Sequence, residues 1–445
     1  MGENKRRVYT LSGYPEEVIA VAFAKTSRSP EPFDQIVKEL TEEKSSKFHE
    51  KWVVGYGHSS VAEHAVLHIA VENASRLAVD IIESCRLSSY TEKSTRYQVI
   101  DKDSVYVPEV GEYKEEYLNT INFLFEVYNE ALEKLTEYFE ETITEEDEKK
   151  KKFMVRAEVI DRARFLLPCS TLANVGITVN ARELEHMLVK MFSYPLKEVQ
   201  DIAEEVKEEG KKEVPTLIKY TNKNKYIVNC SKDFEKEYSG KVSDIEYSTR
   251  LVEYDPEAEE RLIAAILYRF GGMSYKEAKE KSYDKEKIMD IALGKLGKFD
   301  KPLRELEYVN YTFDLLMDFG AYYDFKRHRM CTITPQKVST EYGYTMPEEF
   351  EKIGMKKRFE DAMEKSHQTY LKLKEKYPYE AGYISTNAHK RRVLAQMNLR
   401  ELYHYIKLRG SQMTHFTVRK ITLEMLEELK KVHPLLVKYL KTRDF

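Results

Sequence analysis

The sequence predicts an α+β fold that occurs twice in tandem, and two observations support this prediction. Three pairs of similar segments occur in the same order in the two halves of the chain. Within each half, long stretches with the spacing of an amphipathic helix occur together with short stretches in which apolar and polar residues alternate, the pattern of a half-buried strand. We therefore expect two domains, each built of long helices packed on a small mixed or antiparallel sheet.

The first pair of similar segments is a predicted short strand, a turn and a helix with an acidic first turn. It reads LSGYPEEVIAVAFAKTS near the start and LVEYDPEAEERLIAAILYR near the middle, with the turns at Pro15 and Pro256. Proline followed by glutamate is typical of a helix N-terminus. The other pairs are YVPEVGEY (106–113) with YTMPEEFE (344–351), and VNARELEHML (179–188) with MNLRELYHYI (397–406). Three pairs in one order indicate a tandem duplication.

We expect the repeats to occupy residues 1–235 and 246–445. The segment KYTNKNKYIVNCSKDFEKEYSGKVSD between their ordered parts is polar and rich in turn-forming residues, as a connection would be. Long helices are predicted at 111–140 and 156–168, and short strands near 63–72 and 305–313.

The composition is that of an ordinary globular protein, with 42% hydrophobic and 33% charged residues among 445. No apolar run approaches the ~18 residues that a membrane span needs, and the N-terminus lacks the apolar core of a signal peptide. The formal net charge of −4 disfavours a nucleic-acid binder, and there is no RNP or KH motif. Four scattered cysteines form no CxxC pair, which disfavours zinc ribbons and a disulfide framework. We expect a cytoplasmic protein with no metal site and no membrane or nucleic-acid partner.

Two stretches with basic side chains occupy corresponding places in the repeats. In the first repeat, Ser94 and Arg96 put a hydroxyl and a guanidinium two residues apart, which suits a phosphate. In the second, Arg327, His328 and Arg329 are adjacent at the end of a predicted helix. Taken alone, these three could simply interact with the negative end of the helix dipole.

Aligning the two repeats on Arg86 and Arg329 favours a functional interpretation. Ser84-Cys85 then stands opposite Arg327-His328, and Ser339 stands opposite Arg96. Where one repeat is basic, the other is neutral. This reciprocal loss predicts one composite site assembled from both repeats.

The spacing Arg-His-Arg, seven residues, Ser, any residue, Arg resembles the signature of the flavin-dependent thymidylate synthases (ThyX), here split between the repeats. HSSVAEH (58–64) resembles the family's His-x-Ser-Pro-x-Glu-His segment. ARFLLP (163–168) with TVNAR (178–182) resembles its later helix and flavin-contacting segment, and QMNLRELYHYIKLRGSQMTHFTV (396–418) matches the same region in the second repeat. The resemblance covers most of both halves.

The resemblance implies a site built from two subunits, one giving the Arg-His-Arg segment and a late arginine, the other giving the Ser-x-Arg segment and the arginine of ARxLLP. The late arginine is Arg409, where the first repeat has Met191. The ARxLLP arginine is Arg164, where the second repeat has Gly382. Each repeat thus keeps a complementary share, and we expect a homodimer that forms a pseudo-tetramer of four repeats.

The resemblance also implies the reaction: transfer of a one-carbon unit from methylenetetrahydrofolate to carbon 5 of dUMP, giving dTMP, with FAD as cofactor and NADPH as reductant. Arg409 would lie against the pyrimidine and, with Arg327, is an expected catalytic residue. The expected substrate contacts are Ser94, Arg96, Arg164, Glu92 and Arg409. The expected flavin contacts are Arg327, His328, Arg329, Asn398, Arg400, His58, Ser60 and Glu63.

Departures from the family pattern leave an alternative open. Neither repeat has the complete signature, Asp324 stands where the family often has Gln, and Thr332 where it usually has Ser. The alternative is a catalytically altered or inactive homologue that binds flavin or nucleotide. Reciprocal retention favours catalysis, because a scaffold would lose residues from both repeats indiscriminately.

Several polar residues of the first repeat also have structural interpretations. His58, Ser60 and Glu63 could be satisfied polar groups beside a strand, and the segment from Asn180 to Arg182 could now only pack against or cap its helix. Cys169 follows a proline, as does the nucleophile of the unrelated classical thymidylate synthases, but we expect it to be a buried structural thiol.

Overall fold

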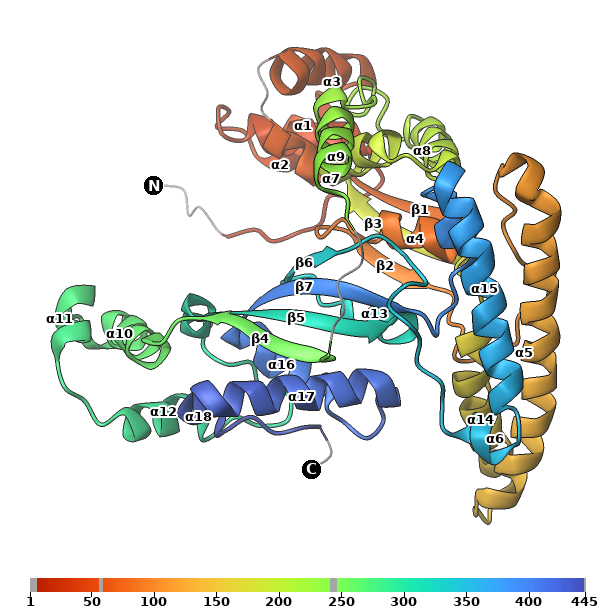
Figure 1. Cartoon of the computed structure of the whole chain (residues 1–445). Helices are drawn as coiled ribbons and strands as arrows, with labels where there is room; N and C mark the ends of the chain where they lie inside the picture. Colours follow the sequence, from red (N-terminus) through yellow and green to blue (C-terminus); the bar gives the residue numbers. More distant parts are fainter. Residues whose placement is uncertain (1–5, 56–58, 241–245, 444–445) are drawn as a thin grey trace. The chain divides into compact units, whose positions relative to one another are not determined.

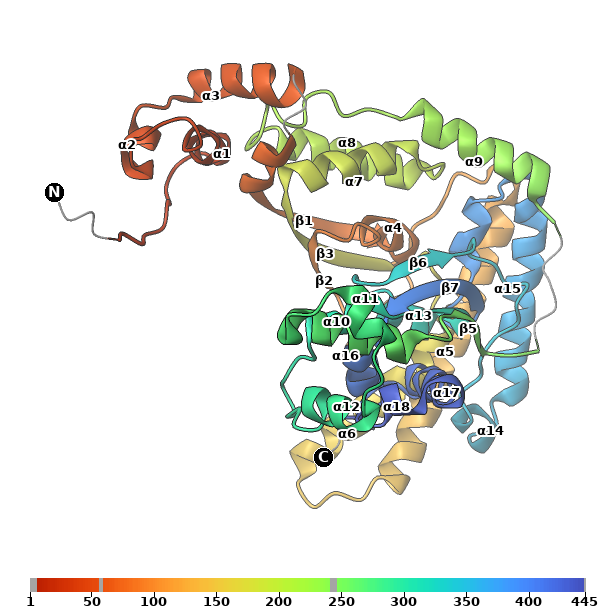
Figure 2. The same cartoon turned by 90° about the vertical axis from the view of Figure 1, so that its left-hand side faces the viewer.

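A computed structural model describes residues 6–55, 59–240 and 246–443, and the chain forms two compact units (Figures 1 and 2). Unit 1 comprises Met1–Ser94, Asp103–Pro108 and Ser170–Gly240, and unit 2 comprises Thr95–Lys102, Glu109–Cys169 and Lys241–Phe445. The units therefore do not coincide with the predicted repeats, because the long helices of the first repeat fold with the second repeat. The repeat boundaries at residues 235 and 246 stay predictions.

Unit 1 contains a three-stranded antiparallel sheet in the order β1-β3-β2. Its strands are β1 (Val66–Ser75), β2 (Ser89–Glu92) and β3 (Leu172–Asn180). Its helices are α1 (Glu16–Lys25), α2 (Phe33–Lys38), α3 (Glu42–His49), the π-helix η1 (Glu50–Gly55), the 3₁₀ helix η2 (Ser59–His64), α4 (Arg76–Ile82), α7 (Ala181–Ser193), α8 (Lys197–Gly210) and α9 (Lys225–Tyr238).

Unit 2 contains a four-stranded antiparallel sheet in the order β4-β5-β7-β6. Its strands are β4 (Thr249–Tyr254), β5 (Asn310–Asp318), β6 (Thr332–Pro335) and β7 (Lys390–Asn398). Its α-helices are α5 (Lys114–Thr142), α6 (Glu148–Ala163), α10 (Ala258–Gly271), α11 (Tyr275–Glu280), α12 (Lys285–Leu293), α13 (Phe319–Phe325), α14 (Glu349–Lys352), α15 (Lys356–Lys376), α16 (Leu399–Arg409), α17 (Phe416–Val432) and α18 (Pro434–Val437). Its 3₁₀ helices are η3 (Gly111–Tyr113), η4 (Arg164–Leu166), η5 (Arg304–Tyr308) and η6 (Glu380–Ile384).

The sheets repeat the same topology, since β1-β3-β2 corresponds to β5-β7-β6. The corresponding strands β3 and β7 each end in an asparagine that caps the following helix. Asn180 Oδ1 accepts the N–H of Glu183 at 2.9 Å, and Asn398 Oδ1 accepts the N–H of Glu401 at 2.9 Å. Asparagine is favoured at this position because its side chain satisfies an N–H that the helix leaves free. The prediction of a duplicated α+β fold is confirmed.

The long helix predicted at 111–140 is confirmed as α5. The helix predicted at 156–168 is confirmed in part, since α6 runs from Glu148 to Ala163 and the 3₁₀ helix η4 follows it. Helix α5 packs antiparallel on α15 of the second repeat (Figures 1 and 2). The hydroxyls of Thr120 and Thr369 lie 2.7 Å apart in the buried centre of this pair. Lys372 binds Glu116 nearer one end of α5, and the helix–helix contact thereby joins the repeats inside unit 2.

Three details differ from the sequence predictions. The strand predicted before Pro15 is wrong: β4 precedes Pro256, but residues 6–12 are not a strand, and their side chains Arg7 and Tyr9 bind Asp34 instead. The strands expected near 63 and 305 begin at Val66 and Asn310, after 3₁₀ turns. The polar connection contains the 14-residue helix α9, whose side chains are all at least partly exposed.

Among the residues that the structure describes, every helix is too short or too polar to cross a lipid bilayer.

The packing of α5 on α15 gives a stability prediction. Thr120 already donates to the carbonyl of Glu116, so the Thr369 hydroxyl is the donor to Thr120. Replacing Thr120 by Val leaves that buried hydroxyl without its acceptor and should lower the free energy of unfolding by about 1–2 kcal/mol in urea titrations. The double variant Thr120→Val/Thr369→Val should lose less than the sum of the single losses. Strictly additive losses would contradict the pairing.

Candidate functional site

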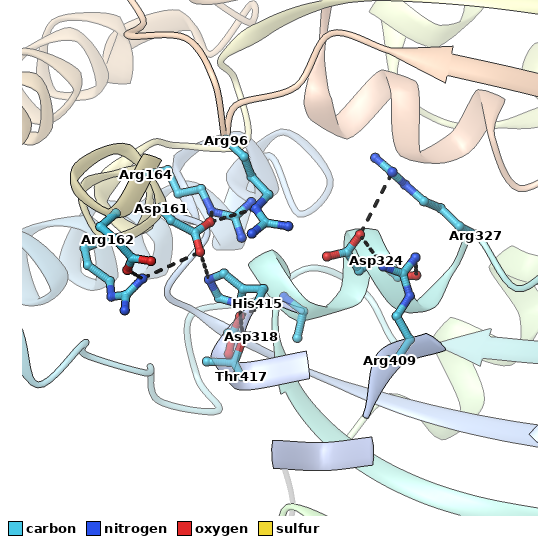
Figure 3. Close-up of polar contacts among 12 residues, drawn as sticks. Arg96, Asp161, Arg162, Arg164, Asp318, Asp324, Arg327, Arg409, His415 and Thr417 are labelled. Atoms are coloured by element: carbon cyan, nitrogen blue, oxygen red, sulfur yellow. Dashed lines mark hydrogen bonds and ion pairs between the residues drawn. The ribbon is translucent and has the colours of Figure 1, made fainter. Parts of the chain in front are cut away.

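One carboxylate, that of Asp161 near the end of α6, holds two arginines of the first repeat (Figure 3). Arg96 Nε lies 3.0 Å and Arg164 Nε lies 3.1 Å from the same Asp161 oxygen, Oδ1. The Arg164 side chain is 4% exposed and that of Arg96 is 31% exposed. Guanidinium is the cation best suited to phosphate or carboxylate.

The turn that carries Arg164 is fixed by the second repeat. After α6 the chain passes through η4, and the peptide groups of Phe165 and Leu167 accept hydrogen bonds from the N–H groups of Ala388 and Asn387, both at 3.0 Å. The side-chain amide of Asn387 donates to the carbonyl of Arg164 at 2.9 Å. The segment that enters β7 therefore holds the first repeat's arginine in place.

A buried histidine and a buried aspartate of the second repeat complete this group. His415 Nε2 lies 3.6 Å from Asp161 Oδ2, and His415 Nδ1 lies 2.8 Å from the Thr417 hydroxyl, which donates to Asp318 Oδ1 at 3.3 Å. Burial, together with the charges of Arg164 and Arg96, lowers the pKa of His415 well below its usual range, so this ring is neutral at pH 7.

The buried Asp318 carboxyl has a raised pKa. Burial raises its pKa to about 6, against the opposing effects of the Ala321 N–H, the Arg164 charge and hydroxyls that include Thr417. Asp318 also caps α13, since its Oδ1 accepts the Ala321 N–H at 2.8 Å. A Cβ added to Gly320 in this turn would lie 3.6 Å from Arg164 Nη2, so the first turn of α13 packs directly against the Arg164 guanidinium.

A second group of charges surrounds Arg409, the last residue of α16. Its Nε lies 3.2 Å from His328 Nε2, and its two terminal nitrogens bind Asp324 Oδ1 at 3.2 Å and the Asp324 carbonyl at 3.1 Å. Arginine can only donate, so His328 Nε2 is the acceptor, and its Nδ1–H donates to Glu401 Oε1 at 3.0 Å. Burial lowers the pKa of His328, which agrees with this neutral ring. Arg327, with a 54% exposed side chain, lies 4.0 Å from Asp324 Oδ1.

Helix α13 connects the two groups. Asp318 stands at its N-cap beside Arg164, and Asp324 is its next-to-last residue beside Arg409. Six residues of helix span about 9 Å. Figure 3 shows the two groups side by side, the Asp161 group on the left and the Asp324 group on the right. A 5′-nucleotide carries its phosphate and its base at opposite ends of a sugar, and this pair of cationic groups suits such a ligand.

Other predicted residues have hydrogen-bond or ion-pair partners outside these groups. The Glu92 side chain is 3% exposed and pairs with Arg76 at 3.0 Å inside unit 1. Asn398 caps α16, and Arg400 binds Glu307 and the Pro302 carbonyl.

The remaining predicted residues have the following places. In unit 1, Ser60 is exposed and Glu63 pairs with Arg182. Ser94 is partly buried at the end of a segment of unit 1, two residues before Arg96, and Arg329 is partly buried in unit 2. His58 lies outside the described residues. The prediction that Cys169 is buried is confirmed at 0% exposure.

Sequence reasoning missed Asp161, Asp318 and His415. Asp161 precedes Arg164 by three residues on a predicted helix, and that spacing puts two side chains on one face, so this pairing could have been found. Asp318 and His415 give no such signal, because their relation to Arg164 depends on packing between distant segments.

The structure is thus a duplicated α+β chain in which one short helix connects two groups of arginine residues. Residues 9–216 and 250–435 match the family model Thy1, described as thymidylate synthase complementing protein. The chain therefore belongs to this family, that of the flavin-dependent thymidylate synthases, and contains two copies of its domain.

Relatives of double and of single length both match. A "UPF0159 protein" of Chlamydia muridarum is 28% identical, with 98% of this chain and 92% of that protein covered, and one of Thermoplasma acidophilum is 28% identical, with 92% and 91% covered. A flavin-dependent thymidylate synthase of Clostridium tetani is 29% identical, with 48% of this chain and 86% of the enzyme covered. A solved Helicobacter pylori flavin-dependent thymidylate synthase, complexed with FAD and dUMP, is 19% identical with a TM-score of 0.30, covering 47% of this chain and 96% of that one.

Asp318 gives a pH-dependent stability prediction. Its pKa is about 6 in the folded chain, against 3.8 for an ordinary aspartate, so the folded state binds the proton more tightly. The contribution of Asp318 to stability is therefore present at low pH and lost as the pH rises from about 4 through 6, by about 3 kcal/mol in all. The variant Asp318→Asn keeps the helix cap but has no group that titrates. The difference between the free energy of unfolding of this variant and that of the wild type should therefore increase as the pH rises over this range.

Denaturant titrations at pH 4 to 7.5 would measure this difference. The exposed Asp290→Asn is the matched control and should show no such trend. A constant difference between Asp318→Asn and wild type across this range would contradict the raised pKa.

Proposed function

We propose that the chain is a flavin-dependent thymidylate synthase that converts dUMP to dTMP with methylenetetrahydrofolate and NAD(P)H at a site built from both repeats. The observation that carries the proposal is the position of Arg96 and Arg164 of the first repeat at one end of α13, whose other end carries the Asp324–Arg409–His328 group of the second. Family membership supports the reaction class.

The phosphate of the nucleotide would bind Arg96 and Arg164, with the Ser94 hydroxyl as a further donor. Each guanidinium has five N–H groups, and Asp161 Oδ1 fixes the orientation of both Nε atoms. Arg164 is buried and preorganised, whereas Arg96 is exposed enough to reach a ligand. Glu92, buried with Arg76, would act by holding the strand that leads to Ser94.

The pyrimidine would lie against Arg409. This guanidinium is 15% exposed and is held by Asp324 and His328. It is therefore a cation of fixed orientation that is largely shielded from water. A cation there would stabilise the imide anion of the pyrimidine, and this anion has a higher electron density at carbon 5. Such electrostatic stabilisation is worth several kcal/mol in a transition state. Arg327, on the other side of Asp324, would assist.

The residues fit FAD in part. Arg327 is exposed and Arg329 partly buried, and such cations suit the pyrophosphate of a dinucleotide. The Asn398 side-chain oxygen is used by the helix cap, which leaves its NH₂ group as the donor to a flavin. His328 would orient Arg409 beside the cofactor, and Arg400, Ser60, Glu63 and His58 would contribute further contacts. When bound, FAD supplies the hydride chemistry, and the protein supplies binding and electrostatics.

A catalytically altered homologue is the second candidate, and one observation favours it. Asp324 stands where the family often has Gln, and its carboxylate binds Arg409 directly. A negative charge at that distance offsets part of the cation that the reaction needs. This candidate would bind flavin or nucleotide without making dTMP.

An absorbance spectrum of the purified chain, recorded before and after adding dUMP, separates these candidates. A flavin spectrum that dUMP perturbs, followed by dTMP formation with methylenetetrahydrofolate and NADPH, supports the synthase. A perturbed spectrum without dTMP supports the altered homologue. Absence of flavin binding, even with added FAD, would overturn the synthase, and absence of both flavin and dUMP binding would overturn both candidates.

The proposal includes a homodimer in the cytoplasm, forming a pseudo-tetramer of four repeats. A family enzyme of single length matches about half of this chain, so one chain corresponds to two family subunits. The division of the site residues between the two repeats supports an assembly in which two chains take the place of four subunits. Light scattering on the purified chain would test the oligomeric state.

Removal of the phosphate arginines should affect nucleotide binding selectively. Loss of one charge-assisted contact costs about 1.5–3 kcal/mol, so Arg96→Ala should weaken dUMP binding about tenfold to 100-fold in titration calorimetry. Arg182→Ala is the matched control, because Arg182 is exposed in unit 1 and pairs with Glu63. An equal loss of affinity in both variants would refute one composite site per chain.

The two capping asparagines give a second matched pair. Asn398→Ala and Asn180→Ala should each lower stability by about 1 kcal/mol, because each removes one helix cap. Only Asn398→Ala should also weaken FAD binding, measured by flavin fluorescence at a temperature where both variants are folded. Equal FAD affinity in the two variants would remove Asn398 from the flavin site.

A further inference from the structure

Unit 1 contains a cluster of metal-ligating side chains at the place where the second repeat has its histidine group. Cys85 follows α4, and Glu183 and His186 lie on one face of α7, three residues apart. One ligand atom from each residue lies within 4.8 Å of the other two. Among the described residues, this is the one such combination of three.

The cluster corresponds residue by residue to a hydrogen-bonded group in unit 2. Aligned as above, Glu183 matches Glu401, His186 matches His404, and Cys85 matches His328. In unit 2, His328 donates to Glu401 at 3.0 Å, and its ring lies 5.5 Å from that of His404. The fold thus brings these three positions together in both units, and only the chemistry of one position differs.

The first repeat has lost the cation of this group but has kept the buried acid. Met191 stands where the second repeat has Arg409, whereas Glu183 keeps its carboxyl with 8% exposure. This carboxyl accepts the Leu87 N–H at 3.3 Å, and its other oxygen lies 3.6 Å from His186 Nδ1. The nearby Lys190 ammonium binds the Ser84 hydroxyl at 2.5 Å. Buried carboxylates are generally paired with a cation or bound to a metal.

We propose that Cys85, Glu183 and His186 bind a divalent transition-metal ion of the zinc type, with the fourth position open to water. Thiolate, imidazole and carboxylate are the three ligand types that zinc takes in proteins, and a thiolate excludes the harder Mg²⁺ and Ca²⁺. The sequence predicts no metal site because it contains no closely spaced cysteines. Cys85 lies far along the chain from Glu183 and His186, so this cluster leaves no such pattern in the sequence.

The geometry needs a small closure. Ligand atoms of a tetrahedral zinc site lie about 3.5 Å apart, given metal–ligand distances near 2.0–2.3 Å. Cys85 and Glu183 are buried, but the His186 side chain is 66% exposed, and a rotation of this side chain would bring its ring nitrogen closer to them. Burial raises the pKa of the Cys85 thiol to about 11, so the metal-free chain holds a neutral thiol, and coordination replaces its proton.

Cobalt(II) is the probe for the test, because thiolate and tetrahedral coordination give it a characteristic absorption spectrum. Metal-free full-length protein should bind one Co²⁺ with a sulfur-to-cobalt charge-transfer band, and one equivalent of Zn²⁺ should displace it. His186→Gln, an exposed change that should preserve the fold, should weaken Zn²⁺ binding at least about tenfold, and Cys85→Ser should abolish the band. Circular dichroism would check the fold of each variant.

Matched controls keep the test specific to this cluster. Cys230→Ser removes another cysteine of unit 1, and His404→Gln changes the corresponding histidine of unit 2; neither should alter Zn²⁺ affinity. Absence of the charge-transfer band in the wild type, its persistence in Cys85→Ser, or unchanged affinity in His186→Gln would overturn the proposal. None of these readouts depends on thymidylate synthesis, so they stand apart from the proposed function.

Discussion

The candidate site depends on a single buried carboxylate, that of Asp161. Arg164 is almost fully buried, and an unpaired buried guanidinium would be costly. Asp161 offsets that cost and also holds Arg96, which reaches it from a separate segment. The second repeat also fixes this group, because Asn387 and Ala388 hold the turn that carries Arg164. The candidate site of unit 2 therefore uses contacts between the two repeats.

Two further buried groups set the charge around Asp161. His415 is kept neutral by burial and by the arginines, whereas Asp318, with a pKa of about 6, is mostly ionised at pH 7 beside Arg164. A third arginine, Arg162, pairs with Glu349 and Glu158 and lies 3.7 Å from Asp161 Oδ2. In the proposed function, the phosphate of a nucleotide would be a further anionic partner of Arg96 and Arg164.

The sequence predicts the elements of this fold better than their grouping. The duplication, the α+β class, the long helices and the division of the arginines follow from local patterns and from the comparison of the repeats. The exchange that puts α5 and α6 with the second repeat has no local signal. The same is true of His415 and Asp318, and of the pairing of Glu92 with Arg76, because each depends on contacts between distant segments. The missing strand before Pro15 shows that local propensity yields to the contacts available, since Arg7 and Tyr9 bind Asp34 instead.

The reciprocal losses have an energetic explanation. Asp324, His328 and Arg409 satisfy one another, so losing one member would leave buried polar groups without partners. The first repeat has lost all three together: the corresponding residues are Ile81, Cys85 and Met191, each at most 9% exposed. Replacing a whole buried ionic group by apolar residues is often neutral or stabilising, whereas partial loss is not. Glu183 is the exception, since it keeps the acid of the original group, accepts the Leu87 N–H and faces His186; in the proposed metal site it would be a ligand.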